Sequence, residues 1–247
     1  MYDAHETETS KKYMYELLKH SSSINIALIG GWAAYIYVNS NYRKAFGLNY
    51  LMSRDIDVFI DVKHEKKFAD LIKNLGFQKS AYPFRYEIIY DKVSNKIITQ
   101  EQAKKQRIFN LFYIFLDLFS NKPTKLLGTW CIGSLNNSKR IFIDNIPILD
   151  INSLILLKTT SFFEREKLDK ELKDACDLYA LVFYSEQNLE LTELLKHALD
   201  KILNREDLCE FISEQVLRDS LKAGIVKRTI SNYLSNIKTS NSARNTK

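Results

Sequence analysis

Two acidic residues on an apolar run are the part of this chain best suited to metal chemistry. Asp55 and Asp57 alternate with Ile56, Val58 and Ile60. Successive side chains of a β-strand point to opposite faces, so the two carboxylates share one face and the apolar side chains share the other. Neighbouring carboxylates repel each other unless a cation lies between them. Mg²⁺ binds one or two carboxylates together with substrate phosphates, so the pattern predicts half of a site for a metal-bound nucleoside triphosphate.

A glycine pair supplies the second half of the expected site. Gly30 and Gly31 lie between an apolar, strand-like run at residues 24–29 and a helix-like run at residues 32–38. Without Cβ atoms, phosphates can approach the backbone closely, and the start of a helix offers free N–H donors. We therefore predict a phosphate-binding turn at this pair.

The order of these motifs resembles the DNA polymerase β-like nucleotidyltransferase superfamily, in which a lone acid follows on a later strand. We assign the lone acid to Asp117, because residues 114–119 are the most continuously apolar of the runs that carry an acid. Such a run is expected of a central strand buried on both faces. Glu87 and Asp144 are also single acids on strand-like runs and remain the alternatives.

Residues beyond 150 resemble the AbiEii-type toxin branch of the same superfamily. Lys158 ends an apolar run, Arg165 follows seven residues later, and Asp174 and Asp177 lie three residues apart. Lys158 and Arg165 would share a face of one helix and bind a triphosphate together. Asp174 and Asp177 would share a face of the next helix and act as supporting residues. Salt bridges among these four residues between two helices are the alternative.

Lys158 is expected to be partly buried, because it directly follows the apolar residues 154–157. A buried ammonium group without a partner is unfavourable, so it must meet an anion. That anion is either a substrate phosphate or one of the carboxylates of Asp174 and Asp177.

The resemblance, which covers about residues 24–183, implies a Mg²⁺- or Mn²⁺-dependent enzyme that moves a nucleotide from an NTP to an acceptor hydroxyl and releases pyrophosphate. Asp55 and Asp57 would hold the triphosphate-bound metal, and Asp117 would bind a second metal or accept the proton of the acceptor. Lys158 joins these three as a catalytic residue. RNA such as tRNA is the favoured acceptor, protein is another, and the toxin branch implies a cognate antitoxin protein as a partner.

Two other functions fit the same motifs. One is an antibiotic-type nucleotidyltransferase that acts on a small molecule, and the other is a non-catalytic module that binds RNA or a partner protein. Residues 1–160 carry 22 basic and 15 acidic residues, residues 161–215 carry 7 and 14, and residues 216–247 carry 7 and 1. Positive charge at both ends suits a polyanion, although a solvated surface explains it equally well. An enzyme for cationic drugs would need an acidic cleft.

Composition predicts a globular protein, since 45% of the 247 residues are hydrophobic. The longest apolar stretch, residues 108–119, is too short to span a bilayer, and no signal sequence is visible, so we expect a cytoplasmic protein without membrane contact. Cys131, Cys176 and Cys209 lie far apart and predict neither a disulfide nor a zinc site. They are expected in the core.

Hydrophobic periodicity predicts an α+β protein with a mixed sheet flanked by helices, followed by a C-terminal helical bundle. Residues 1–150 would form a nucleotidyltransferase catalytic domain, and residues 151–247 a helical domain with a basic tail. Strands are expected at residues 24–29, 56–61, 84–90, 109–119, 140–143 and 147–149, and helices at residues 11–20, 32–38 and 65–76. Residues 92–107 are expected to be loop.

Overall fold

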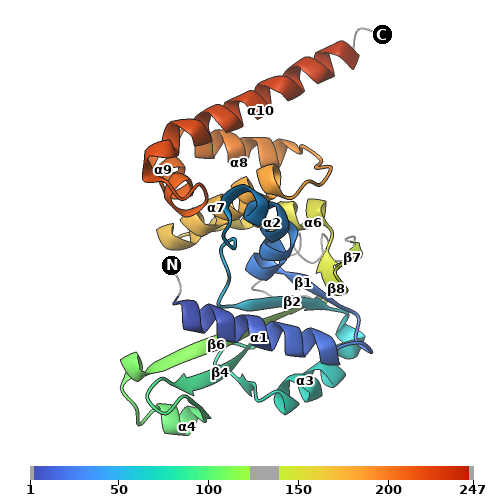
Figure 1. Ribbon diagram of the computed structural model, residues 1–247. Helices are drawn as coiled ribbons and strands as arrows, with labels where there is room; N and C mark the ends of the chain where they lie inside the picture. The colour runs from blue at the N-terminus through green and yellow to red at the C-terminus, as the bar shows by residue number, and fades with distance from the viewer. Residues whose placement is uncertain (1–2, 123–138, 245–247) are drawn as a thin grey trace. The chain divides into compact units, whose positions relative to one another are not determined.

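The chain has an α+β fold, as predicted. A computed structural model describes residues 3–122 and 139–244, with side chains up to residue 236 (Figure 1). The chain divides into two compact units. The first contains Met1–Ile36 and Met52–Ser153, and the second contains Tyr37–Leu51 and Leu154–Lys247. The division predicted at residue 150 did not anticipate that Tyr37–Leu51 joins the C-terminal unit.

A mixed sheet forms the centre of the first unit. In the described part of the chain its order is β3-β4-β6-β2-β1-β8-β7, and β5 also pairs with β4. The strand β2 runs parallel to β6 and antiparallel to β1, whereas β4 and β6 are antiparallel. The strands are β1 (Ile26–Ile29), β2 (Ile56–Ile60), β3 (Gln78–Lys79), β4 (Arg85–Asp91), β5 (Lys96–Ile98), β6 (Leu111–Ser120), β7 (Arg140–Ile143) and β8 (Ile146–Leu149).

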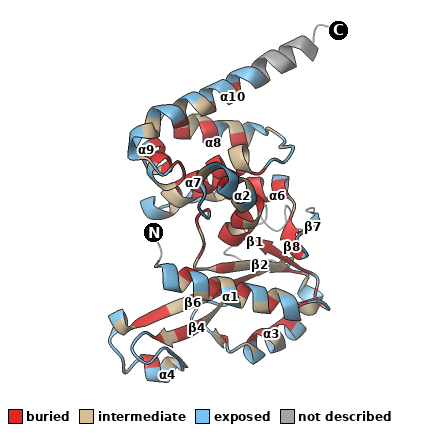
Figure 2. Cartoon of the chain, in the orientation of Figure 1, coloured by how far each residue is buried: buried red, intermediate tan, exposed pale blue. Residues whose placement is uncertain are grey.

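Burial along the strands follows the predicted alternation. In β2, Ile56, Val58 and Ile60 are buried, and Asp57 and Phe59 on the other face are half-buried. Figure 2 shows that β1 and β8 are buried over most of their length, and every residue of both strands is buried. The acid-bearing face of β2 is therefore the face open to a ligand.

Helices α1 (Ala4–His20) and α3 (Glu65–Asn74) belong to the same unit, and α1 contacts both β6 and α3. Met14 and Leu17 of α1 are fully buried. The helix begins seven residues before the predicted residue 11, because the Asp3 side chain accepts hydrogen bonds from the N–H groups of His5 and Glu6. A side-chain acceptor at this position stabilises a helix start.

Residues 92–107, predicted to be loop, contain the short strand β5 and the one-turn helix α4 (Gln100–Ala103). Thr99 and Gln102 form a reciprocal capping box at the start of α4. Ile89, Ala103 and Leu111 form a small apolar cluster beneath them. This structure was missed because its apolar residues find their partners on β4 and β6 and not within the segment.

The second unit is helical, as predicted. It is built from α7 (Leu168–Tyr184), α8 (Glu193–Leu203), α9 (Glu206–Gln215), α10 (Ala223–Arg244) and most of α6 (Ile151–Glu164). Cys176 and Cys209 are buried and free, in line with the expected core role, whereas Cys131 lies outside the described residues. No helix in residues 3–122 or 139–244 is long and apolar enough to cross a membrane.

The segment Tyr37–Leu51 is held in this unit by two buried tyrosines. The hydroxyl of Tyr42 donates to the carbonyl of Val216 at 2.7 Å, and that of Tyr50 donates to Asp177 Oδ1 at 3.0 Å. Helix α2 (Gly30–Phe46) therefore runs on past residue 38, where the prediction ended it. In residues 39–44 only Tyr42 is apolar, so the local signal for the longer helix is weak, and the buried contacts of Tyr42 support it.

Candidate active site

Two carboxylates lie side by side on adjacent parallel strands. Asp57 of β2 pairs in register with Asp117 of β6. Paired residues on neighbouring strands point to the same face, and such strands are about 4.8 Å apart. Asp117 is only 6% exposed, and Asp57 is half-buried. The repulsion between the two charges is therefore only weakly screened by water, which favours a cation beside them.

The alternatives to Asp117 are placed differently. Glu87 on β4 pairs in register with Phe115, and its carboxylate accepts a hydrogen bond from Gln100 at 2.9 Å. Asp144 lies in the exposed turn that joins β7 to β8. Only Asp117 of these three acids is the direct neighbour of Asp57 on the sheet.

The Asp57 carboxylate occupies the space that a side chain at Gly30 would fill. A Cβ atom built on Gly30 would lie 2.0 Å from Asp57 Oδ2 and 2.6 Å from Cγ. Gly30 also has a φ of +68°, which side chains disfavour. Gly31 follows as a buried residue in the first turn of α2. We predicted that the glycines leave room for a phosphate, whereas the room at Gly30 is taken by Asp57.

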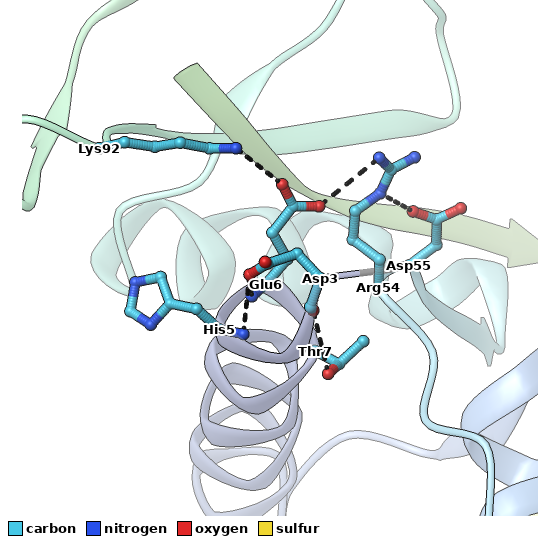
Figure 3. Close-up of polar contacts among 7 residues, drawn as sticks. All are labelled: Asp3, His5, Glu6, Thr7, Arg54, Asp55 and Lys92. Carbon is cyan, nitrogen blue, oxygen red and sulfur yellow. Dashed lines mark hydrogen bonds and ion pairs between the residues drawn. The ribbon is translucent and has the colours of Figure 1, made fainter. Parts of the chain in front are cut away.

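Asp55 is tied to the start of α1 through a chain of charges (Figure 3). It lies in a bend before β2, where Arg54 Nε approaches its Oδ1 at 3.3 Å. Arg54 Nη1 lies 3.9 Å from Glu6 Oε2, and Lys92 Nζ lies 3.3 Å from the other oxygen of Glu6. Because of the bend, Arg54 reaches Asp55 itself, which an ideal strand would not allow.

Arg85 is the residue of this site that sequence reasoning missed. From β4 it donates two hydrogen bonds to Asp117, from Nε to Oδ1 and from Nη2 to Oδ2, both at 2.6 Å. Its guanidinium group also lies 4.5 Å from the centre of the Phe115 ring. A bidentate pair of this kind is the strongest arrangement an arginine makes with a carboxylate.

The three acids act together on Arg85. Its pKa is raised above the usual value, first by the hydrogen bonds to Asp117 and, against the effect of burial, by the charges of Asp117, Asp55 and Asp57. All three carboxylates therefore lie within electrostatic reach of one guanidinium group. With Arg54 included, three negative charges face two positive ones, which leaves the site net negative.

The carboxylates fit a divalent cation only in part as they stand. Among the described residues, no three acid, histidine or cysteine side chains are arranged to hold a metal ion. Asp55 and Asp57 offer hard oxygen ligands of the kind that Mg²⁺ takes together with phosphate oxygens. Asp117 is a weaker ligand as long as Arg85 neutralises it with two hydrogen bonds.

Lys158 meets its anions within the second unit. Its Nζ donates to Asp174 Oδ1 at 3.1 Å and to Asp177 Oδ2 at 2.6 Å, and all three side chains are buried. The two carboxylates hold the pKa of Lys158 above its usual value, although burial acts in the opposite direction. The sequence allowed either a substrate phosphate or these carboxylates as the anion that Lys158 needs. In the structure the carboxylates of Asp174 and Asp177 are that anion.

Arg165 completes this cluster from outside α6, which ends at Glu164. Its Nε donates to Asp174 Oδ2 at 2.7 Å, so Arg165 and Lys158 share Asp174. Lys158 and Arg165 were predicted to share a helix face for a triphosphate, and they instead meet at a carboxylate. The four residues form the salt-bridge network that was the alternative.

The basic C-terminal segment is partly neutralised. Lys227 pairs with Glu206, and Lys222 lies 3.3 Å from Asp219. The side chain of Lys238 lies outside the described residues. The charge of +6 in residues 216–247 therefore overstates the cations that this segment offers to a polyanion.

No protein-family model and no curated protein matches the chain. It is similar to the solved structure of an antigenic nucleotidyltransferase-like protein from Paracoccidioides brasiliensis, with 17% identity, a TM-score of 0.46, and 85% of this chain and 94% of that chain covered. The antibiotic-resistance factor ANT(2'')-Ia is similar with 10% identity, a TM-score of 0.42 and coverage of 96% and 99%. The lincomycin-bound lincosamide antibiotic adenylyltransferase LnuA has 15% identity, a TM-score of 0.39 and coverage of 72% and 98%. Similarity at this level does not define the function of the chain.

Replacing Gly30 with alanine should displace Asp57 and abolish any metal-dependent activity. The control is Gly47→Ala, because Gly47 has a similar φ of +71° but no atom within 4 Å of its Cβ position. Both variants should lose about 1–2 kcal/mol of unfolding free energy from the left-handed backbone, measured by urea denaturation. Gly30→Ala should lose more than Gly47→Ala, because its Cβ would also lie 2.8 Å from Asp57 Cβ. Only Gly30→Ala should lose activity, and full activity in that variant would contradict the close contact with Asp57.

Replacing Arg85 with glutamine should destabilise the protein without metal and strengthen its response to metal. Asp117 would be left buried beside Asp57 without a counter-charge, at a cost of about 3–5 kcal/mol. A divalent cation would then bind without competition from Arg85 and stabilise the folded state more. Thermal melts with EDTA and with Mn²⁺ measure both effects, and an Mn²⁺ shift equal to that of the wild type would show that Arg85 does not compete.

Replacing Lys158 with methionine should destabilise the protein in the absence of nucleotide. Asp174 and Asp177 would remain buried without their shared cation, which costs about 3–5 kcal/mol. Lys196→Met is the control, since within the described part of the chain Lys196 pairs only with the exposed Glu193, and the change should alter stability by less than about 1 kcal/mol. A Lys158→Met protein as stable as the wild type would mean that the cluster does not support the fold.

Proposed function

We propose that the chain is a Mg²⁺- or Mn²⁺-dependent nucleotidyltransferase that transfers a nucleotide from an NTP to a hydroxyl group. The observation that supports this most directly is the parallel pairing of β2 with β6, which puts Asp57 next to Asp117, while Asp55 lies in the bend before β2. The sequence order of Gly30, Asp55, Asp57 and Asp117, which resembles the polymerase β-like superfamily, agrees with this geometry.

The three acids have two roles in the proposed reaction. Asp55 and Asp57 hold the triphosphate through a divalent cation, which supplies charge neutralisation for the phosphates when it is bound. Asp117 accepts the proton of the acceptor hydroxyl, whose oxygen bonds to the α-phosphorus. The bond from that phosphorus to the bridging oxygen breaks, and pyrophosphate leaves with the electron pair.

Arg85 weakens Asp117 as a base. In the described structure both oxygens of Asp117 accept hydrogen bonds from Arg85, which stabilises the ionised carboxylate and lowers its affinity for a proton. The triphosphate offers Arg85 a more highly charged anion at the same site. We propose that Arg85 turns from Asp117 to a phosphate when the NTP binds, which takes the phosphate-binding role first assigned to Lys158 and Arg165. Those two residues, with Asp174 and Asp177, then support the fold of the second unit.

RNA such as tRNA is the proposed acceptor, in line with the excess of basic residues in 1–160. A role as a toxin with a cognate antitoxin is part of the same proposal and rests on the resemblance of residues 154–177 alone. Incubation with each α-labelled NTP, Mg²⁺ or Mn²⁺ and total cell extract tests the acceptor class. Label should enter RNA. Label in protein or in small molecules would show that RNA is not the acceptor. No transfer under any condition would contradict the proposed nucleotidyltransferase activity.

Substitution of the acids should separate these two roles. Asp57→Asn, and Asp55→Asn nearly as strongly, should abolish transfer because each removes a ligand for the metal-bound triphosphate. Asp117→Asn should reduce turnover by at least about 100-fold while Mg²⁺-NTP binding survives, since a lost general base costs 10²–10⁴-fold.

Glu87→Gln and Asp144→Asn are the matched controls, and both should keep nearly full turnover. Rates come from pyrophosphate release, and NTP affinity comes from equilibrium dialysis. An inactive Asp144→Asn protein together with an active Asp117→Asn protein would show that the third acid is assigned to the wrong strand.

A further inference from the structure

A small lobe projects from the ends of β4 and β6 in the first unit (Figure 1). It comprises residues 92–110, and we call it the 92–110 lobe. Its base is closed by a hydrogen bond from the N–H of Lys92 to the carbonyl of Asn110 at 2.7 Å. Inside, Ala103 and Ile98 pack on Ile89 and Leu111. The lobe is therefore a built structure, and its outer side chains are not needed for that packing.

The outer surface of this lobe is strongly basic. Residues 92–109 include five basic residues and one acidic residue, Glu101. Lys96, Lys104 and Lys105 are exposed and form no ion pair within the described part of the chain. Lys222 and Lys227 of the C-terminal segment, in contrast, are both paired with acids. The lobe thus offers cations that have no acid to neutralise them, as a polyanion requires.

Apolar side chains stand among these cations. Residues 104–109 are exposed without interruption, and they end in Ile108 and Phe109, which are 80% and 66% exposed. The guanidinium group of Arg107 lies 5.9 Å from the centre of the Phe109 ring. An exposed aromatic ring with an arginine beside it is the arrangement on which unpaired nucleic-acid bases stack. A basic surface that served only to solvate the protein would not require the exposed side chains of Ile108 and Phe109 beside its lysines.

We propose that the 92–110 lobe binds the single-stranded part of an RNA, with Lys96, Lys104, Lys105 and Arg107 on phosphates and Phe109 under a base. The lobe ends where β6 begins, and Asp117 lies six residues along that strand from Leu111. At about 3.3 Å per residue this is roughly 20 Å, or about six stacked nucleotides. The identification of this RNA as the acceptor rests on the proposed function, whereas the binding itself does not.

Fluorescence anisotropy with a labelled single-stranded RNA of 12 nucleotides, without metal or NTP, tests the proposal on the full chain. The lobe variant combines Lys96→Gln, Lys104→Gln, Lys105→Gln and Arg107→Gln. The matched control combines Lys66→Gln, Lys67→Gln, Lys73→Gln and Lys79→Gln, which are exposed on α3 and β3 and lose the same charge. None of these eight residues belongs to the proposed catalytic site.

The lobe variant should bind the RNA at least about tenfold more weakly, and the slope of log affinity against log salt should flatten by up to about 3 units. The control should stay close to the wild type. Phe109→Ala should weaken binding about tenfold with an unchanged salt slope, and duplex RNA should bind less well than single strands. Polyglutamate at equal charge concentration should not displace the RNA.

Equal losses in both quadruple variants, or none in the lobe variant, would overturn the proposal, as would a wild type without RNA affinity. Displacement by polyglutamate would point to an acidic protein as the occupant instead. Pyrophosphate release measured on the same preparations separates the two proposals. If the lobe binds RNA but no transfer occurs, only the proposed nucleotidyltransferase activity is contradicted. If transfer occurs and the lobe variant binds RNA as the wild type does, only the proposed RNA-binding role of the lobe is contradicted.

Discussion

The repulsion between Asp57 and Asp117 is the constraint on which the first unit depends. The parallel pairing of β2 with β6 places both carboxylates in one row of the sheet, where little water screens them. Gly30 leaves the space that the Asp57 carboxylate needs, and Arg85 neutralises Asp117 from the neighbouring strand. Arg85 neutralises only one of the two carboxylates, so the pair keeps a net negative charge that favours a bound cation.

The second unit shows the opposite use of buried charge. Lys158 is enclosed with Asp174 and Asp177, and Arg165 balances the remaining negative charge. Tyr50 donates to Asp177 as well, and burial and this carboxylate both raise the pKa of its phenol. Every charge in this cluster is matched by a partner within the chain. Such a closed network supports the fold and has no net charge to offer a ligand.

The sequence predicted the α+β class and the face on which Asp57 lies, because the alternation of apolar residues in β2 and the burial of β6 are local signals. It did not predict Arg85, whose partner Asp117 is 32 residues away and is reached only through the register of β4 with β6. The length of α2 was missed for a similar reason, since the hydroxyl of Tyr42 bonds to Val216. Local pattern reveals elements and faces, and long-range register decides which side chains meet.

The charges of Lys158 and its neighbours show where spacing alone is ambiguous. A buried lysine after an apolar run requires an anion, and the sequence offered both a phosphate and the acids at positions 174 and 177. The structure places those acids within 3.1 Å of the ammonium group. Periodicity predicts the helices of this unit but not how they pack, and their packing is what brings the two acids to Lys158.

The most direct measurement of the central claim is a crystal structure of the chain with Mn²⁺ and a non-hydrolysable NTP analogue, with the metal located by anomalous scattering. The account predicts an anomalous peak bound by the carboxylates of Asp55 and Asp57 and by phosphate oxygens, with Arg85 turned from Asp117 to the triphosphate. A metal peak away from these acids, or a nucleotide bound while Arg85 keeps both hydrogen bonds to Asp117, would contradict it.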